Sequence, residues 1–179
     1  MAEFKKCCFV ESFQRFFPLR IVDLDNIPQT DFVQDTESVC VEELIKIAHD
    51  MISLCDKSKG VGLSAFQCGL PLKMFVAKED SVNFRCFLDS SYNSEKEKVD
   101  SVEGCLSIKN NFGNPKIFLV KRYPSVRIVG KELNLKDPFN PIKNIECEMT
   151  GIFGVILQHE IDHHHGVLIS HIGTEIEVV

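Results

Sequence analysis

Residues 151–166, GIFGVILQHEIDHHHG, decide the fold because they join a long apolar run to a cluster of chemically active side chains. The run is too long for a strand, and its apolar residues recur at the helical period, which predicts a buried helix. His159 and His163 are four residues apart, so both imidazoles lie on one helix face and can reach a single metal ion. Glu160 lies beside that face, where it can take a proton from a water on the metal. The stretch therefore predicts a core helix that carries a metal site.

Several classes of metal-dependent hydrolase share this H-E-x-x-H pattern and differ in the third ligand. A catalytic zinc site needs three protein ligands and one open position. One protease group takes a histidine from H-E-x-x-H-x-x-G-x-x-H, but the residue at that position is Ile169, and His171 lies two residues too far along. Thermolysin-like sites take a glutamate from a second helix downstream, for which the residues after His163 leave too little room. Both protease arrangements therefore lack their third ligand.

Two upstream segments offer further site residues. Cys105, in EGCLS at 103–107, supplies a thiolate, which is a strong ligand for a divalent transition metal, and Gly104 lets the backbone come close. By composition alone, any of the eight cysteines could serve. The segment GVGLSAFQ, at 60–67, has two glycines that let the chain pass tightly against a bound extended peptide, although taken alone it is an ordinary turn.

Composition limits the class of protein. With 179 residues, 44% of them hydrophobic and 14 of them Phe, the chain is long and apolar enough for one domain with its own core. No apolar run approaches the roughly 20 residues that cross a bilayer, so no membrane association is expected. A net charge of −6 argues against direct nucleic-acid binding. The cysteines form no C-x-x-C pair and no signal peptide precedes them, which favours a reducing compartment such as the cytoplasm.

The remaining chain predicts the order of elements. Residues 1–17 are expected to form a short amphipathic extension packed on the domain, and 18–179 a single catalytic domain. A helix is predicted from an N-cap at Thr36 to about Cys55. Strands are predicted at 73–77, 83–88, 116–123, 125–133 and 143–148, with polar loops at 90–100 and 109–114. Strands followed by one core helix predict an α+β fold, with antiparallel strands packed around the H-E-x-x-H helix and a helix near the N-terminus.

Taken together and in this order, the three segments resemble the peptide deformylase family. The family signatures G-x-G-L-A-A-x-Q, E-G-C-L-S and Q-H-E-x-D-H-L-x-G stand here as GVGLSAFQ (60–67), EGCLS (103–107) and QHEIDHHHG (158–166). The likeness extends over about residues 18–168. It implies a metal-dependent hydrolase that removes the formyl group from the N-terminal formyl-methionine of new polypeptides and releases formate.

The resemblance also implies roles for individual residues. The metal ligands would be Cys105, His159 and His163, and Glu160 would be the general acid and base. The side-chain amide of Gln67 and the backbone N–H of Leu106 would form the oxyanion hole. The implied native ion is Fe(II), whereas the ligand types also accept Zn, Ni or Co.

Around these residues we expect a substrate pocket and a supporting set of polar side chains. The pocket for the methionine side chain is expected on the helix face before His159, with glycines and a valine opposite: Ile152, Val155, Ile156, Val61, Gly62 and Gly104. The supporting residues are Glu103, which could orient a ligand histidine, Gln158, and Asp162, which the family arrangement pairs with Arg122.

The chain departs from the family pattern in places. Ser64 replaces an Ala, and His164 replaces a Leu; we interpret His164 as a partly exposed histidine, the alternative being a group that tunes Glu160. The loop at 109–116 is longer and lacks the family's peptide-binding Arg, so peptide preference can differ. The tail carries Glu175 and Glu177 where some bacterial members have a basic helix, so any contact with the ribosome is expected to be transient and without such a helix.

Two other functions fit parts of the sequence. One is another metal-dependent amidohydrolase or peptidase, against which the residue at position 169 counts. The other is a non-catalytic binder of nascent N-termini, which predicts a damaged ligand or base, although every such residue is present. The expected location is the cytoplasm of a bacterium or of a phage-infected host, with a plastid or mitochondrion as the alternative.

Overall fold

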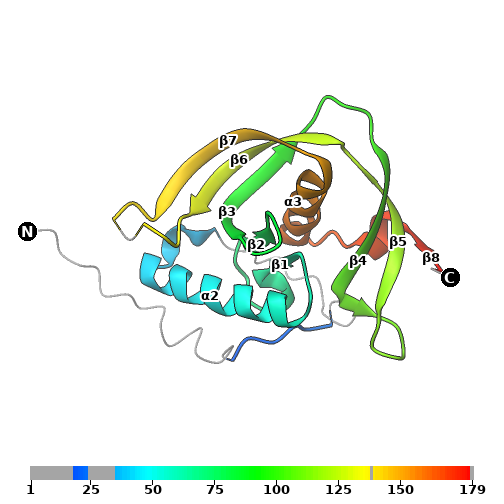
Figure 1. Ribbon diagram of the computed structural model, residues 1–179, viewed down its shortest axis with the longest axis horizontal. Helices are drawn as coiled ribbons and strands as arrows, with labels where there is room; N and C mark the ends of the chain where they lie inside the picture. The colour runs from blue at the N-terminus through cyan, green and yellow to red at the C-terminus, as the bar shows by residue number, and fades with distance from the viewer. Residues whose placement is uncertain (1–17, 24–34, 138, 178–179) are drawn as a thin grey trace, which may run out of the picture.

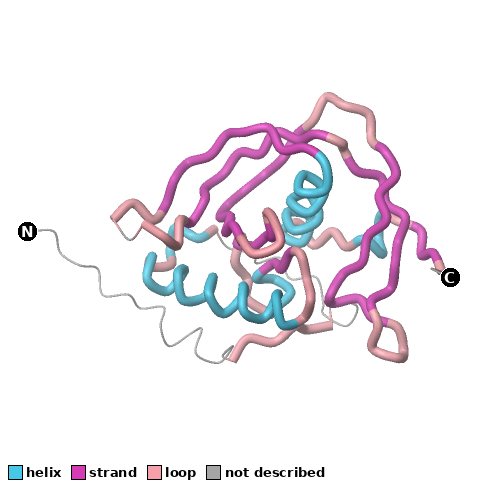
Figure 2. The backbone as a smooth tube through the Cα atoms, viewed as in Figure 1, coloured by secondary structure: helices cyan, strands magenta, loops and turns pink. Residues whose placement is uncertain are grey.

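Antiparallel strands make up most of the molecule (Figures 1 and 2). The computed structural model describes residues 18–23, 35–137 and 139–177, so the extension expected at 1–17 lies outside the described residues. Within them the helical elements are η3 (Thr36–Ser38), α2 (Val41–Lys57), η4 (Ala65–Cys68), α3 (Gly151–His164) and α4 (Ile169–Ile172). The strands are β1 (Gly62–Ser64), β2 (Met74–Lys78), β3 (Phe84–Asn93), β4 (Val99–Lys109), β5 (Pro115–Arg122), β6 (Ser125–Leu133), β7 (Ile142–Thr150) and β8 (Thr174–Ile176).

The strands form two sheets, and every pairing is antiparallel. One sheet has the order β1-β2-β3-β6-β7 and the other β4-β5-β8. Strands β1 and β4 are therefore edges, each with one side free of a strand partner among the described residues. Figure 1 shows β3, β6 and β7 curving over α3, with β4 and β5 on the other side of this helix. The predicted α+β class with antiparallel sheets and few helices is confirmed.

Helix α3 lies between the two sheets, and most of its surface is buried. It begins at Gly151, whose φ of 62° turns the chain sharply out of β7, and it packs against β1, β2, β3, β6 and β7. Its apolar side chains, among them Leu157 and Ile161, meet Phe75 and Phe87 of the larger sheet in one core cluster. A helix buried on most sides is apolar on most sides, as the sequence of 151–166 predicted.

Helix α2 covers another part of the core but starts later than predicted. It begins at Val41 with Cys40 as N-cap, so Thr36 is not the cap. Instead the backbone N–H and the hydroxyl of Thr36 both donate to the carboxylate of Asp89, at 2.8 and 2.7 Å. A contact with a residue 53 positions away thus takes the side chain that local sequence assigned to the helix end.

The polar loop predicted at 90–100 is also wrong in part. Strand β3 continues to Asn93 and β4 already begins at Val99. Asp89 adopts a left-handed φ of 47°, and the register with β6 shifts between Leu88 and Ser91 before pairing resumes. This β-bulge lets a polar segment continue as a strand, which its composition does not indicate. The short α4 and β8, after residue 166, were not predicted. No helix among the described residues is long and apolar enough to span a bilayer.

Gly154 tests how tightly α3 packs on the sheet. A Cβ atom at this position would lie 2.9 Å from the carbonyl oxygen of Met149, a backbone atom that cannot move aside easily. Gly154→Ala is therefore expected to lower the free energy of unfolding by about 1–3 kcal/mol, although the same change in an open helix gains roughly 0.5–1 kcal/mol. Denaturant titration measures the difference. Ser53→Ala, on an exposed face of α2, is the control, and a Gly154→Ala protein more stable than the parent would contradict the packing.

Candidate metal centre and catalytic pocket

Three potential metal ligands meet where β4 passes α3. The donor atoms of Cys105, His159 and His163 all lie within 4.8 Å of one another, and the Sγ of Cys105 is 3.6 Å from the Nε2 of His163. Burial lowers the pKa of His163 well below its ordinary value, so its imidazole is neutral, which is the form that binds metals. One thiolate and two imidazoles suit a divalent transition metal, so the residues present fit such an ion.

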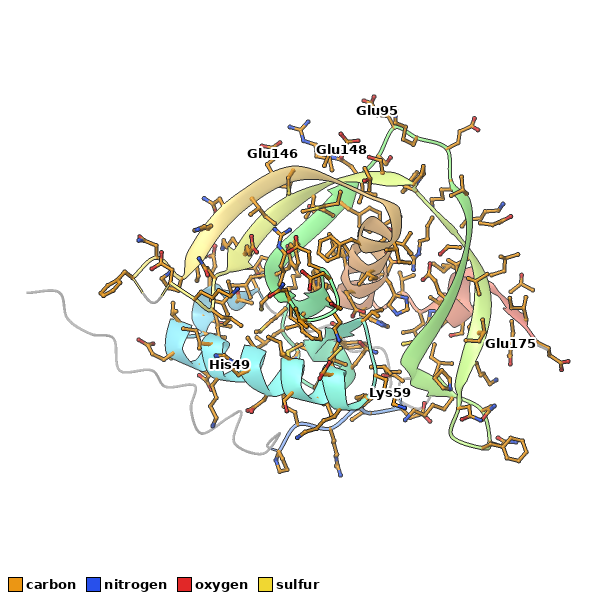
Figure 3. The ribbon with its side chains drawn as sticks, viewed as in Figure 1. His49, Lys59, Glu95, Glu146, Glu148 and Glu175 are labelled. Carbon is orange, nitrogen blue, oxygen red and sulfur yellow. The ribbon has the colours of Figure 1, made fainter. Side chains whose placement is uncertain are left out.

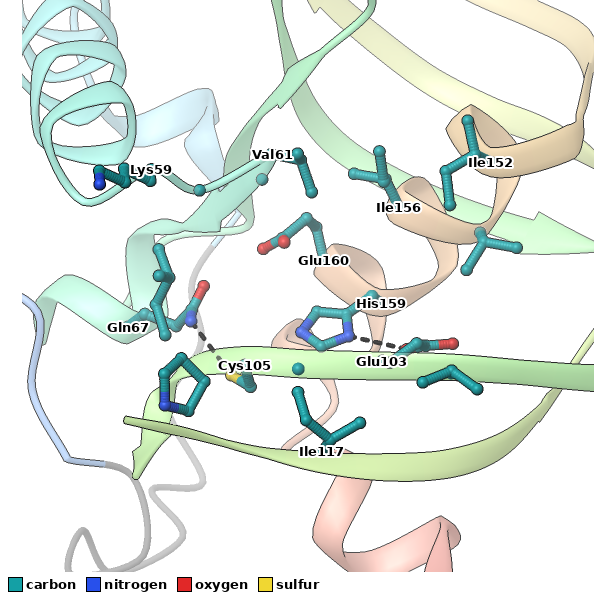
Figure 4. Close-up of a pocket in the computed structure, with 17 residues that line it drawn as sticks. Lys59, Val61, Gln67, Glu103, Cys105, Ile117, Ile152, Ile156, His159 and Glu160 are labelled. Atoms are coloured by element: carbon teal, nitrogen blue, oxygen red, sulfur yellow. Dashed lines mark hydrogen bonds and ion pairs between the residues drawn. The ribbon is translucent and has the colours of Figure 1, made fainter. Parts of the chain in front are cut away.

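A hydrogen bond fixes the orientation of His159. Its Nδ1 lies 2.9 Å from Oε2 of Glu103, which leaves Nε2 on the side of Cys105 (Figure 4). Burial alone would raise the pKa of Glu103, but hydrogen bonds from His159 and Arg122 outweigh it and lower this pKa to about 2. Burial would likewise lower the pKa of His159, yet its contacts with Cys105 and Glu103 raise it to about 10. Glu103 is therefore an anion that holds the ring in place, and a metal ion that binds at Nε2 would displace the proton to which this pKa refers.

Behind Glu103 lies a fully buried arginine. Arg122 is 2% exposed, and its Nε and one terminal nitrogen bind the two oxygens of Glu103 at 2.9 and 3.1 Å. Its other terminal nitrogen donates to Oδ2 of Asp162 on α3. The pairing expected between Asp162 and Arg122 is present, and Tyr92, which sequence reasoning did not single out, donates its hydroxyl to Oδ1 of Asp162 at 2.9 Å.

Glu160 lies beside the ligands with an unusual pKa. It is 3% exposed, and burial raises the pKa of its carboxyl to about 7, although His159 and Arg122 oppose the rise. Its Oε2 has no hydrogen-bond partner among the described residues. Gly62 passes so close that a Cβ atom there would lie 2.3 Å from Oε1 of Glu160. A carboxyl group with this pKa can accept and return a proton near neutral pH.

Gln67 approaches the centre from the opposite side. It follows β1 in η4, where its Oε1 accepts from the backbone N–H of Ser64 at 2.9 Å. This bond turns the amide nitrogen toward β4, 3.4 Å from Sγ of Cys105 and 3.3 Å from the hydroxyl of Ser107 (Figure 4). Leu106, which follows Cys105 on β4, lines the cavity beside these residues. An N–H donor thus faces the centre from η4, and β4 supplies a second backbone segment beside it.

A cavity of about 300 Å³ opens beside Glu160 and Cys105. The structure places all six predicted substrate-binding residues in its lining, where Ile152 and Ile156 on α3 face Val61 (Figure 4). His163 does not line the cavity, although its side chain lies in the same ligand cluster as Cys105 and His159. Sequence reasoning missed four lining residues, which only the meeting of β4, β5 and the α2–β1 turn brings together: Lys59, Val102, Pro115 and Ile117.

The contacts of two residues on α3, His164 and Gln158, correct or add to what the sequence indicated. His164 is 4% exposed and lies 5.5 Å from the ring of Phe75, so the interpretation as a partly exposed histidine is wrong. It faces β2 in the core, and burial lowers its pKa to about 4. The amide of Gln158 hydrogen-bonds away from the ligands: its Oε1 accepts from the N–H of Tyr123, and its Nε2 donates to the carbonyls of Tyr123 and Gly154, all near 3 Å. It fastens α3 to the β5–β6 connection.

The segments that depart from the family pattern lie at the edge of the smaller sheet. Residues 110–114 form the turn between β4 and β5, with the Oδ1 of Asn110 accepting from the N–H groups of Phe112 and Asn114. Phe112 is 89% exposed. Near the C-terminus, Glu175 belongs to strand β8 and points outward, as do Glu146 and Glu148 on β7 (Figure 3).

Comparison with known proteins finds one family. The model of the family described as polypeptide deformylase matches residues 20–176. The peptide deformylase of Desulfotalea psychrophila is 32% identical over 160 residues, covering 84% of this chain and 86% of that protein. The peptide deformylase of Mesorhizobium japonicum is 37% identical over 135 residues, covering 72% and 70% respectively.

Solved structures share the fold. A peptide deformylase from Synechococcus elongatus in complex with actinonin superimposes with a TM-score of 0.73 at 21% identity, covering 88% of this chain and 79% of that one. A probable peptide deformylase from Synechococcus phage S-SSM7 gives a TM-score of 0.69 at 23% identity and covers 86% and 99%. This chain therefore has the same overall fold as these proteins.

The low pKa of Glu103 predicts how stability changes with pH. A carboxyl that titrates near 2 in the folded protein and near 4.5 when unfolded stabilises the fold above pH 4.5, and this contribution disappears as the pH falls toward 2. In chelator-treated protein, Glu103→Gln should lower the free energy of unfolding by roughly 2–3 kcal/mol at pH 6, and the difference should shrink between pH 4.5 and 2. Urea titrations across this range measure it. Glu97→Gln, exposed between β3 and β4, is the control, and a difference independent of pH would refute the assignment.

Proposed function

Because this chain belongs to the polypeptide deformylase family, and is therefore a metal-dependent hydrolase that removes the N-terminal formyl group from nascent peptides, we propose a role in that reaction for each residue of the pocket. The observation that carries the proposal is the convergence of Cys105, His159 and His163 beside a buried Glu160, at one end of an apolar cavity. A formyl-methionine substrate needs two adjoining sites, one for the formyl group and one for the methionine side chain.

Cys105, His159 and His163 would hold one divalent ion, and Fe(II) is the proposed native ion, with Zn, Ni or Co as substitutes. When bound, the ion supplies Lewis acidity, which can bring the pKa of a water from about 15.7 toward 7. Three protein ligands leave a position open for that water and for the substrate. Glu103 contributes by holding His159 with Nε2 toward the ion.

Glu160 is the proposed general acid and base. Its pKa of about 7 lets it accept the proton of the attacking water and then deliver this proton to the departing α-amine. The close approach of Gly62 keeps the carboxylate at the cavity wall and leaves little room above the reacting carbon. Besides its oxygen and the amide nitrogen, a formyl carbon carries only a hydrogen atom. This narrow space would therefore admit a formyl group and exclude larger acyl groups.

The amide of Gln67 and the backbone N–H of Leu106 are the proposed oxyanion donors. Gln67 is fixed in advance, since its oxygen is already engaged by Ser64 and only its nitrogen faces the centre. By exchanging its contact with Cys105 or Ser107 for the formyl oxygen, this amide would stabilise the charge that develops there.

The cavity would take the methionine side chain between Ile152, Val155 and Ile156 on α3 and Val61, Gly62 and Gly104 opposite. The rest of the peptide would extend between β1 and β4. Both are edge strands, and the free side of an edge strand can pair with an extended peptide through its backbone groups.

We propose that the protein meets its substrates in a reducing compartment where new chains begin with formyl-methionine. This is the cytoplasm of a bacterium or phage-infected host, or else a plastid or mitochondrion. The six described cysteines form no disulfide, which agrees with a reducing compartment. Contact with the ribosome would be transient, because residues 174–176 form a strand beside acidic side chains rather than a basic helix.

The role of Glu160 is tested by formate release from a formyl-Met tripeptide. Glu160→Gln removes the proton acceptor but keeps the shape, so kcat/KM should fall by about 10²–10⁴ while metal content stays unchanged. Glu42→Gln, on an exposed face of α2, should match the parent. Normal turnover by Glu160→Gln would overturn the mechanism, and absence of turnover by the metal-loaded parent protein would favour a non-catalytic binder.

The identity of the ion is tested by metal analysis. Protein purified without oxygen is expected to carry stoichiometric iron and to be more active than the same chain reloaded with zinc. Cys105→Ser should lose the metal, because a hydroxyl is a much weaker ligand than a thiolate. Cys147→Ser, on β7 and outside the cavity lining, is the matched control. Anaerobic protein that contains zinc and no iron, at full activity, would contradict the assignment of Fe(II).

A further inference from the structure

A tyrosine hydroxyl lies at the far end of the polar chain that reaches the metal ligands. Tyr92, on β3, is partly buried, and its hydroxyl donates to Oδ1 of Asp162 at 2.9 Å. Its ring lies edge-on to that of Tyr123, with 6.5 Å between the centroids. None of the roles proposed above uses Tyr92, although its partner Asp162 is adjacent in sequence to a ligand.

The contacts from Tyr92 to the ligand are continuous. Asp162 uses Oδ1 for Tyr92 and Oδ2 for Arg122, so both of its oxygens have donors. Arg122 then binds both oxygens of Glu103, and Oε2 of Glu103 meets Nδ1 of His159 at 2.9 Å. Each of the three side chains in the middle of this series has a partner on both sides, and all three are buried.

The geometry gives the Tyr92 hydroxyl a specific task. A carboxylate can rotate about its last bond, and a donor on each oxygen fixes that rotation. With Oδ1 of Asp162 held, Oδ2 points to Arg122, and the planar guanidinium is then fixed in the orientation that engages both oxygens of Glu103. Without Tyr92, a buried acceptor loses its donor, and Asp162 can turn away from the arginine.

We propose that Tyr92 is a positioning residue for the metal site, whose hydroxyl holds His159 in its ligating orientation through Asp162, Arg122 and Glu103. The inference rests on the proposed function, because it assumes that His159 is a ligand. Tyr92 is not among the residues that line the cavity, and its hydroxyl donates to Asp162, so its path to His159 runs through the residues between.

Burial and the neighbouring Asp162 both raise the pKa of Tyr92 above its ordinary value. The hydroxyl therefore keeps its proton over the whole range in which the enzyme works. It remains a donor to Asp162, which is the property that the positioning role needs.

The affinity of the protein for Co²⁺ tests the proposal without relying on turnover. Tyr92→Phe removes only the hydroxyl. Because partners in direct contact with a ligand change metal affinity by about 10–100-fold, a residue further along the chain should change it by roughly three- to tenfold. Chelator competition measures the affinity, and the visible spectrum of the Co²⁺ protein reports the ligand geometry. We expect weaker binding and a shifted spectrum.

Tyr123→Phe is the matched control, because it removes a hydroxyl from the neighbouring ring that takes no part in the chain of contacts. It should leave the Co²⁺ affinity and spectrum unchanged. Denaturant titration of both metal-free variants shows whether they fold, so a loss of affinity is not mistaken for a loss of structure.

A double-mutant cycle tests the route. If Tyr92 acts through Glu103, then Tyr92→Phe should change the Co²⁺ affinity by less than about twofold in a Glu103→Gln background. An undiminished effect in that background would overturn the route. A Tyr92→Phe protein that matches the parent in affinity and spectrum would overturn the inference, while formate release by the parent would leave the proposed function intact. If the parent protein binds no Co²⁺ through Cys105, the inference about Tyr92 and the proposed function are both overturned.

Discussion

The buried guanidinium of Arg122 is the interaction on which the site depends. It lies at the end of β5, binds Glu103 on β4 with two nitrogens and Asp162 on α3 with the third, and so ties the smaller sheet to the helix. Removing one partner of such a buried group is destabilising, because it leaves part of a buried charge uncompensated. The position of β4 relative to α3 is thus fixed by charge as well as by packing, and Cys105 and His159 are carried on these same two elements.

The same arrangement separates two carboxyl groups by environment. Glu103 faces Arg122 and His159, and its pKa falls to about 2, whereas Glu160 is buried without a hydrogen bond to one of its oxygens, and its pKa rises to about 7. Two glutamates that line the same cavity therefore differ in protonation at neutral pH. One is an anion hydrogen-bonded to His159, and the other can exchange a proton, so that one pocket gives like groups different properties.

The proposed ligands and base on α3 could be predicted because helical spacing places them. His159, His163 and Glu160 lie within five residues, and their relative positions follow from the helix alone. The pocket residues of the same face, such as Ile152 and Ile156, follow equally. Cys105 was different, since nothing local separates it from seven other cysteines, and only its place in a motif in the right order singled it out. His164 was judged wrongly because burial depends on β2, which lies far away in sequence.

By itself, the sequence indicated the helix at 151–166, the proposed ligands and base, and the strands β2, β3, β5, β6 and β7, because these depend on periodicity and on motifs within a few residues. Strands β1, β4 and β8 were not predicted. The tertiary structure decided the start of α2, where Thr36 binds Asp89, the continuation of β3 through a bulge, and the contact of Tyr92 with Asp162. These contacts join residues more than 30 positions apart, and their energies depend on the burial that folding creates. Local propensity carries no record of such partners, so the chain of contacts behind His159 becomes visible only when the two sheets close on α3.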